Sequence, residues 1–400
     1  MREIAVIGVG MGTPGSMTVE AADFCRGAQL LIGAERMLGA VEMREGQIRC
    51  VEYLPDRVCA CIEAHPEAER VAILLSGDVG FFSGAKKLLE AIPDAAVYSG
   101  ISSAVCFAGR LRMSWEDWKL TSSHGRHCNL IGEIARNKKV FTILGTKDAA
   151  AEICRKLVYY GLDGIRIHIG ENLGYPEERL LSGVPEDFAE HAGTPLSVML
   201  IENPSPRRTV VHGIPDEEFI RDKVPMTKEE VREISVSKLQ LAEDSVIYDI
   251  GAGSGSCSVE IALMAVQGKV YAIEKNPVAV ELLHKNKRKF AVDNMEIIEG
   301  EAPSAMADLP VPTHAFIGGS SGNMKEILQV LLEKNPHIRV VVNAITLETV
   351  DEALALLGKE PFTGLDIAAV STAKSKTVGR YHMMMGQNPV YIFAADAKDR

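Results

Sequence analysis

The sequence has no excess of basic residues and no long apolar run. Its 43 lysines and arginines are outnumbered by 54 aspartates and glutamates, for a formal net charge of -11. Affinity for a phosphate backbone comes from clustered lysine and arginine, so nucleic-acid binding is not expected as the main activity. No apolar stretch approaches the roughly 20 residues that a membrane helix needs. The apolar run at residues 4–9 is also too short for a signal peptide. We therefore expect a cytoplasmic protein that binds no membrane.

The cysteines show none of the spacings that bind metals. There are 8 of them, they are scattered along the chain, and no two form a CxxC pair. Cys59 and Cys61 form a CxC, but no second pair or histidine cluster completes a set of zinc ligands. We expect no metal site, and reduced, mostly buried thiols throughout.

The length of 400 residues exceeds that of one ordinary core and predicts two domains. In both halves, short β-branched runs alternate with helical patterns, which predicts α/β folds with mostly parallel sheets. Between the halves, Pro204 and Pro206 stand beside Arg207 and Arg208, a composition typical of a surface linker. We expect domains at residues 1–203 and 213–400, joined by a linker at residues 204–212.

A glycine loop follows the predicted strand at residues 246–249. It reads Asp249-Ile250-Gly251-Ala252-Gly253-Ser254-Gly255. Glycine suits a sharp strand-to-helix turn because a side chain there would collide with a close ligand. The dinucleotide pattern G-x-G-x-x-G fails, since Ser256 stands at its sixth position. Glu274 ends the next predicted strand, where an acid can bind both ribose hydroxyls. The loop resembles the nucleotide loop of methyltransferases; a nicotinamide or flavin site and a plain turn are the alternatives.

Two further segments are expected at the same site. Thr227 fits a helix N-cap with Glu230 as its capping-box partner, and it acts either as a cap alone or also as a ligand contact. Gly318, Gly319 and Ser320 follow a predicted strand. Ligands in open α/β sheets bind beyond the carboxyl ends of strands, so this loop is expected to face the substrate. A plain turn is the alternative.

The first half carries four motifs at the ends of predicted elements, where sites are usually built. They are Gly8-Val9-Gly10-Met11-Gly12, Ser76-Gly77-Asp78-Val79-Gly80-Phe81-Phe82, Gly100-Ile101-Ser102-Ser103 and Ser122-Ser123-His124-Gly125-Arg126. The first breaks the dinucleotide pattern, with Thr13 where the third glycine belongs. Taken singly, Asp78 also fits a turn residue, His124 a loop histidine and Arg126 a solvated cation.

On these motifs the first half resembles the tetrapyrrole methylases, whose two α/β lobes hold S-adenosylmethionine in the cleft between them. Residues 33–38 and 124–126 are similar to the members that methylate precorrin at C5. The second half resembles their companions, which methylate C15 and remove the acetate carboxyl; its matching stretches include residues 225–234, 249–260 and 316–322. The whole chain thus resembles the fused precorrin C5,15-methyltransferases (decarboxylating) of cobalamin biosynthesis. The resemblance implies a two-lobed class III tetrapyrrole methylase fold, then a doubly wound, Rossmann-like class I methyltransferase fold.

The resemblance also implies the site residues and the reaction, which decarboxylates the C12 acetate and gives precorrin-8. S-adenosylmethionine is expected in both domains, bound by Met11, Asp78, Phe81, Ser102, Ser103, Thr227, Gly251, Ala252, Gly253, Ser254, Gly255, Glu274 and Ala302. The catalytic candidates are His124, Arg126, Gly318, Gly319 and Ser320, with His124 suited to proton transfer because histidine titrates near neutrality. The macrocycle's carboxylates need cations, and the candidates are Arg126, Arg207, Arg208, Lys374, Lys376 and Arg380. Each of these also fits a solvated surface charge.

Two other functions stay open at this point. The second domain could methylate RNA or protein, although the missing basic surface speaks against RNA. The chain could also be a non-catalytic module that binds a tetrapyrrole or the cofactor. The resemblance implies a homo-oligomer, and it does not distinguish a metal-free precorrin from a cobalt-precorrin macrocycle.

Overall fold

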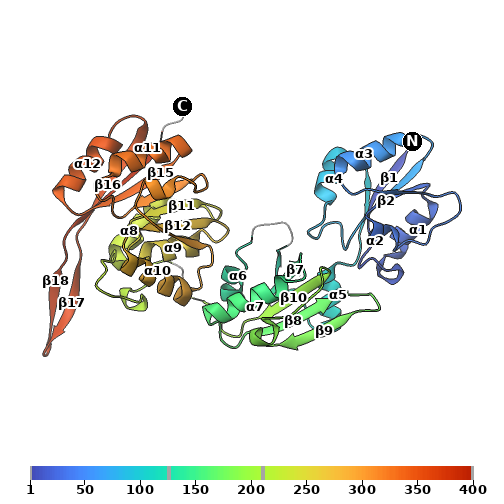
Figure 1. The fold of residues 1–400 in the computed structure, drawn as a ribbon, viewed down its shortest axis with the longest axis horizontal. Coiled ribbons are helices and arrows are strands. Elements are labelled where there is room, and N and C mark those ends of the chain that lie inside the picture. Colours follow the sequence, from blue (N-terminus) through green and yellow to red (C-terminus); the bar gives the residue numbers. More distant parts are fainter. Residues whose placement is uncertain (1, 124–127, 209–211, 398–400) are drawn as a thin grey trace. The chain divides into compact units, whose positions relative to one another are not determined.

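The computed structural model describes residues 2–123, 128–208 and 212–397. The chain divides into two compact units (Figure 1). Residues 1–126, 137–158 and 163–205 form the first unit, and residues 127–136, 159–162 and 206–400 form the second. His124, Arg126 and part of the expected linker lie outside the described residues.

The first lobe of the first unit is a parallel sheet with the strand order β3-β2-β4-β1-β5. Its strands are β1 (Glu3–Gly8), β2 (Leu30–Gly33), β3 (Ile48–Val51), β4 (Arg70–Leu75) and β5 (Ala96–Tyr98). Helices α1 (Val19–Gly27) and α2 (Glu35–Leu38) pack on one face, and α3 (Pro55–Ala64) and α4 (Ala85–Ala91) on the other. Strands β1, β2 and β4 are covered on both faces and are therefore almost continuously apolar. These apolar runs are the reason that the sequence predicted them as strands.

The second lobe differs from the predicted mostly parallel arrangement. Its sheet has the order β6-β7-β10-β8-β9, with only β6 and β7 parallel. The strands are β6 (Lys119–Ser122), β7 (Lys139–Leu144), β8 (Arg166–Glu171), β9 (Arg179–Gly183) and β10 (Ser197–Glu202). The helices of this lobe are α5 (Ser103–Leu111) and most of α7 (Ala149–Tyr160), whereas α6 (Leu130–Arg136) belongs to the second unit. The prediction is wrong here because residues 172–178, which join β8 to β9, form a loop and not a crossover helix, and the two strands pair antiparallel.

The second unit is a doubly wound sheet with the order β13-β12-β11-β14-β15-β19-β16. The strands are β11 (Val246–Ile250), β12 (Lys269–Glu274), β13 (Met295–Glu299), β14 (His314–Ile317), β15 (Arg339–Ala344), β16 (Phe362–Val370) and β19 (Val390–Ala397). The first five in that order are parallel, and β19 runs antiparallel to both neighbours. This confirms the expected fold. The strand order reverses between β11 and β14, and such a switch point opens a crevice for a ligand.

Helices cover both faces of this sheet. One face packs against α8 (Glu229–Leu239), α9 (Ser256–Met264) and α10 (Pro277–Phe290), and the other against α11 (Met324–Lys334) and α12 (Leu347–Leu357). The longest helix among the described residues, α10, has 14 residues. None of the described helices is long and apolar enough to cross a membrane.

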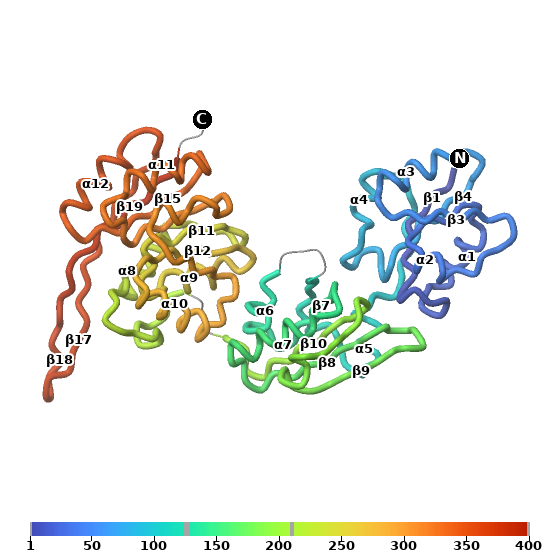
Figure 2. The backbone as a smooth tube through the Cα atoms, viewed as in Figure 1, coloured from blue at the N-terminus to red at the C-terminus, as the bar shows by residue number. Residues whose placement is uncertain are grey.

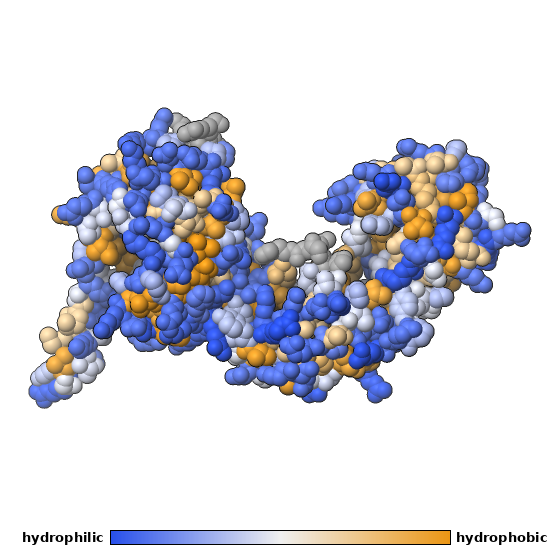
Figure 3. Space-filling model, viewed as in Figure 1, coloured by the Kyte–Doolittle hydropathy of each residue, from blue (hydrophilic) through white to orange (hydrophobic). Residues whose placement is uncertain are grey.

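A two-stranded hairpin of β17 (Ala373–Val378) and β18 (Tyr381–Gly386) extends away from the second unit's sheet (Figure 2). It carries exposed apolar side chains, with Met384 65% exposed, and apolar surface is visible along it in Figure 3. Lys374, Lys376 and Arg380 lie on this hairpin or at its turn.

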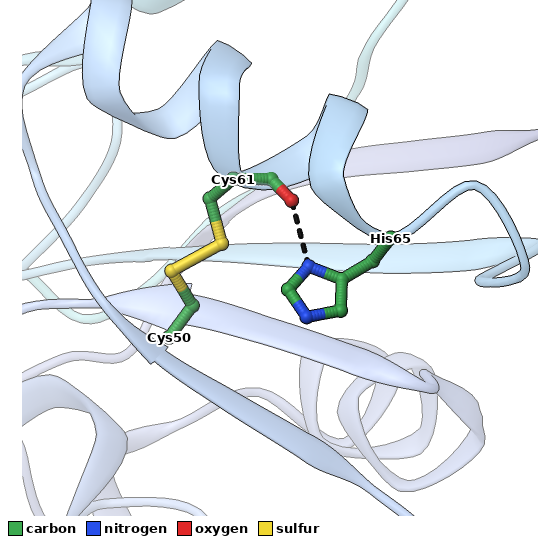
Figure 4. Close-up of a disulfide and its surroundings, with 3 residues drawn as sticks. All are labelled: Cys50, Cys61 and His65. Atoms are coloured by element: carbon green, nitrogen blue, oxygen red, sulfur yellow. Dashed lines mark hydrogen bonds between the residues drawn. A yellow bond between two sulfur atoms is a disulfide. The ribbon is translucent and has the colours of Figure 1, made fainter.

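One disulfide corrects the expectation that every cysteine is a free thiol. Cys50 on β3 is joined to Cys61 on α3, and the His65 ring contacts the Cys61 carbonyl oxygen at 2.8 Å from Nδ1 (Figure 4). The spacing of the cysteines could not show this pair, because only the packing of α3 against the sheet brings the two residues together.

Candidate active site

A cavity of about 600 Å³ opens at the carboxyl ends of β11, β12 and β14 in the second unit. Its wall includes most residues that the sequence assigned to this half: Thr227, Gly251, Ala252, Gly253, Ser254, Glu274, Ala302, Gly318, Gly319 and Ser320. Gly255 does not line the cavity; it caps the start of α9 in a left-handed conformation. The crevice therefore lies where the strand order reverses, with the predicted segments around it.

The glycine loop is shaped by close approach to the loop after β14. Gly251 has φ +73°, and a Cβ at this position would lie 2.6 Å from the Gly319 carbonyl oxygen. The amides of Gly318 and Gly319 both donate to the Ile250 carbonyl, at 2.9 and 3.3 Å. Only a residue without a side chain fits Gly251, so the pairing of these two loops is the physical reason for that glycine.

Glu274, at the end of β12, organises the loops on both sides of it. The Gly253 N–H donates to Glu274 Oε2 and the Asn276 N–H to Oε1, each at 2.8 Å. A carboxylate offers about four lone-pair sites, so both oxygens can accept further hydrogen bonds from a ligand. Such a carboxylate can accept hydrogen bonds from a pair of ligand hydroxyls.

Asp249 and Ser254 are buried polar residues in the cavity wall. Asp249 is 1% exposed, and the Ser258 hydroxyl donates to its Oδ2. Within the described part of the chain, Asp249 Oδ1 and Ser254 Oγ have no hydrogen-bond partner. Burial raises the pKa of Asp249 to about 7, with the Glu274 charge adding and the Ser258 hydrogen bond opposing. Buried polar atoms normally find partners, so this wall suits a polar ligand.

Thr227 lines the cavity, but the capping box predicted for it is not formed. Helix α8 begins at Glu229, its N-cap is Lys228, and no side chain caps it from that position. The Asp216 carboxylate instead accepts from the Glu229 N–H at 3.0 Å. A residue distant in sequence thus replaces the local cap.

A buried ion network, which the sequence analysis missed, fixes the segment that carries Thr227. Arg232 is fully buried; its Nε donates to Glu260 Oε1 at 2.7 Å and its Nη1 to the Thr227 carbonyl at 2.8 Å. Nη1 also lies 3.2 Å from Asp216 Oδ1. The two acids that neutralise Arg232 are far from it in the sequence. The sequence therefore gave no sign of this network.

Two further residues of the wall were not predicted. Asn343, at the end of β15, accepts from the Ser235 hydroxyl at 3.0 Å, and its buried Nδ2 has no partner among the described residues. Burial raises the pKa of the Cys257 thiol, which keeps it protonated. A thiol in that state is a poor nucleophile, so the wall offers no activated cysteine.

In the first unit, three of the predicted motifs meet beyond the ends of β1, β4 and β5. The Gly10 N–H donates to the Gly77 carbonyl at 3.1 Å, and the Gly77 N–H returns a bond at 2.7 Å. A Cβ on Gly100 would lie 2.3 Å from the Gly77 carbonyl oxygen. The glycines thus allow three backbone segments to touch at one edge of the sheet.

Next to this junction is a second cavity, of about 590 Å³, whose wall includes Met11, Phe81 and Ser103. Asp78 and Ser102 do not line it. The Asp78 carboxylate accepts from the Gly80 and Gly100 amides at 2.8 and 3.2 Å, and the Ser102 hydroxyl caps α5. In this structure they hold the loops beside the cavity.

The predicted substrate cations that the structure describes do not line either cavity. Lys374 pairs with Glu229 and Glu230 at 3.1 and 3.0 Å, and Arg207 Nη2 donates to the Phe290 carbonyl at 2.7 Å. A different cation, Arg36, lies in the wall of the first unit's cavity. The only signal for it in the sequence was its place within residues 33–38, which carry part of the family resemblance.

Comparison with known proteins matches two families to different stretches of the chain. Residues 3–189 match the family described as Tetrapyrrole (Corrin/Porphyrin) Methylases, and residues 217–397 match the Precorrin methyltransferase domain. The reversed strand order, the glycine loop beside it and Glu274 define the second unit as a class I methyltransferase fold.

Several relatives correspond in length to about half of the chain. A probable cobalt-precorrin-6B C15-methyltransferase (decarboxylating) of Sulfurisphaera tokodaii is 42% identical over 187 residues, which are 45% of this chain and 95% of the relative. The cobalt-precorrin-6B C15-methyltransferase (decarboxylating) of Salmonella typhimurium is 36% identical, over 46% of this chain and 96% of its own. A solved precorrin-6Y C5,15-methyltransferase of Geobacter metallireducens is 38% identical, covers 48% of this chain and 100% of its own, and has a TM-score of 0.45. The chain belongs to the family of cobalt-precorrin-6B C15-methyltransferases (decarboxylating).

Proposed function

We propose that this chain methylates a precorrin macrocycle at C5 in the first unit and at C15 in the second, where it also removes the carboxyl of the C12 acetate. The product is then precorrin-8, an intermediate of cobalamin biosynthesis. S-adenosylmethionine is the methyl donor in both units. The observation that carries the proposal is the second unit's cavity, where the glycine loop, Glu274 and unpartnered buried polar atoms converge.

The residues of the second unit's cavity fit S-adenosylmethionine. Glu274 would hold the two ribose hydroxyls, and the glycine loop leaves room for the backbone to approach the ligand closely. Asp249 Oδ1 and Ser254 Oγ are the buried polar atoms that a bound ligand or its water would satisfy. In the first unit, Met11, Phe81 and Ser103 occupy the corresponding role, and Asp78 supports them by holding the neighbouring loops.

The chemistry that the cofactor supplies when bound is a methyl group on a sulfonium sulfur. The chain's own task is to place the macrocycle carbon in line with that methyl group, and orientation of this kind contributes on the order of 7–11 kcal/mol. Apolar wall residues such as Ile273 and Phe316 are nearly fully buried, and they exclude water from the acetate carboxylate that leaves.

The direct test is incubation of the purified chain with S-adenosylmethionine and the precorrin substrate, in metal-free and cobalt-loaded forms. We expect a product that has gained two methyl groups and lost carbon dioxide, measured by mass spectrometry. Substrate recovered unchanged in mass in both forms, with the chain folded and the cofactor intact, would refute the function.

Glu274→Gln separates the two proposed sites. The amide keeps the size of the side chain but offers one acceptor oxygen instead of two, so we expect cofactor affinity in the second unit to fall roughly 10- to 100-fold. Calorimetry with S-adenosylhomocysteine should then detect one tight site per chain where the unaltered protein has two. Methylation at C15 should fail while methylation at C5 persists; loss of both in a folded variant would contradict separate sites.

The oligomeric state and the location of the protein are part of the same proposal. We propose that the chain acts as a homo-oligomer in the cytoplasm, and sedimentation equilibrium of the purified protein tests the first part. A monomer at micromolar concentration would overturn it.

A further inference from the structure

Arg36 is the one charged side chain among the described residues that line the first unit's cavity. It is the second residue of the short helix α2, and the cavity wall around it is made largely of apolar groups such as Phe81, Leu144 and Leu173. A lone cation in such a wall is costly unless a ligand or solvent compensates it.

Three neutral groups fix the guanidinium. Nη1 donates to the Met11 carbonyl at 3.0 Å and to the Tyr175 hydroxyl at 2.9 Å, and Nη2 donates to the Ser76 hydroxyl at 3.0 Å. Tyr175 in turn donates to the Gly12 carbonyl at 3.2 Å, so the two lobes of the unit meet at this side chain. These contacts hold the plane of the guanidinium beside the loop that carries Met11 and Gly12.

Two of the five N–H donors of Arg36 are left over. Nε and the second hydrogen of Nη2 have no partner among the described residues, and these adjacent donors form one of the forks that match a carboxylate. Two other arginines of the first unit are paired with acids: Arg49 with Glu35 at 2.5 Å and Arg110 with Glu178 at 2.7 Å. No carboxylate of the described residues pairs with Arg36, although acids stand close by in sequence.

We propose that Arg36 binds a carboxylate of the ligand that enters this cavity, through a bidentate contact from Nε and Nη2. The inference rests on the proposed function, under which the cavity receives two molecules with carboxylates. One is the macrocycle, with its acetate and propionate side chains, and the other is the cofactor, with its amino-acid end. Arg36 thereby orients its ligand against the Met11 loop and acts as a specificity-determining residue for the first methylation.

The test compares Arg36→Met with Arg49→Met in the Glu274→Gln background, so that cofactor binding in the second unit does not mask the result. The probes are S-adenosylhomocysteine, followed by calorimetry, and a stable porphyrin with acetate and propionate side chains, followed by its absorbance. We expect Arg36→Met to weaken one probe roughly 10- to 100-fold and to leave the other unchanged. The affected probe identifies the source of the carboxylate. Arg49→Met removes an equal charge that is already paired, and it should change neither.

Two further variants separate binding from a structural role. Arg36→Lys keeps the charge but not the fork, so it should weaken the same probe by a smaller factor. Tyr175→Phe removes a contact that positions Arg36 and leaves the cation in place, so it should weaken the probe less than Arg36→Met does.

The proposal is overturned if a folded Arg36→Met binds both probes like the unaltered chain, or if Arg49→Met causes the same loss. Should Arg36→Met fail to fold, full affinity of Arg36→Lys for both probes would overturn it instead. A chain that shows the Arg36 dependence but never methylates C5 would sink the proposed function and not this site.

Discussion

The buried carboxyl of Asp249 makes the stability of the second unit depend on pH. Burial raises its pKa in the folded chain to about 7, from the model-compound value of 3.8. The folded state therefore binds a proton that the unfolded chain releases between these two values, and stability falls as pH rises through them. The replacement Asp249→Asn keeps the shape and the Ser258 contact but removes the titration.

The size of the effect follows from the shift. At about 1.36 kcal/mol per pKa unit, a shift of about three units costs about 4 kcal/mol once the group is ionised in both states. Part of this is already lost at pH 5, so about 2–3 kcal/mol remains to be lost between pH 5 and pH 8. The difference in unfolding free energy between the Asn variant and the unaltered chain should grow by that amount.

The assay is urea unfolding at pH 5, 6.5 and 8 with far-UV circular dichroism as the signal. Both tryptophans, Trp115 and Trp118, lie in the first unit, so tryptophan fluorescence serves as an internal control that should not respond. The exposed Asp244→Asn is the matched variant, and it should follow the unaltered chain at every pH. If Asp249→Asn differs from the unaltered chain by a constant offset across this range, the carboxyl is ionised throughout and the reasoning fails.

Two more predictions concern packing around the same cavity. Arg232→Met leaves the buried Glu260 without a cation, while Asp216 keeps Arg221 and Lys228 at 3.5 and 3.8 Å. We expect the unfolding free energy in urea titrations to fall by about 3–5 kcal/mol; a change under about 1 kcal/mol would mean the network is dispensable. Gly251→Ala places a Cβ 2.6 Å from the Gly319 carbonyl oxygen at φ +73°, so we expect a loss of roughly 1–3 kcal/mol and weaker S-adenosylhomocysteine binding in calorimetry. Unchanged affinity in a folded Gly251→Ala chain would show that the two loops do not need this close approach.

Much of the site could be predicted because its chemistry is local in the chain. The glycine loop stands directly after an apolar run, and Glu274 ends the next one, so the parallel sheet brings both to one edge. The same holds for the three glycine segments of the first unit, which follow β1, β4 and β5. When a site is built from residues that directly follow strands, the sequence alone is sufficient to predict which residues come together.

The capping of α8 shows where local reasoning failed. Thr227 and Glu230 have the spacing of a capping box, yet Asp216 takes the role by accepting from the Glu229 amide. Local propensities identify only the capping residues that lie nearby in the sequence. Here the Asp216 carboxylate, which pairs with Arg232, takes the place of the local cap. The antiparallel pairing of β8 and β9 was missed for a related reason, since strand direction depends on the connection as well as on the pattern.

The sequence by itself determined the two α/β halves, the glycine loops and the position of Glu274 at the end of a strand. Each of these features depends on residues that are close together in the chain. Only the tertiary structure decided which cations are paired and which are not. Lys374 is neutralised by Glu229 and Glu230, while Arg36 is held by Met11, Ser76 and Tyr175 with no acid among its described partners. Charge compensation acts through space, so residues far apart in the chain settle it when the lobes come together.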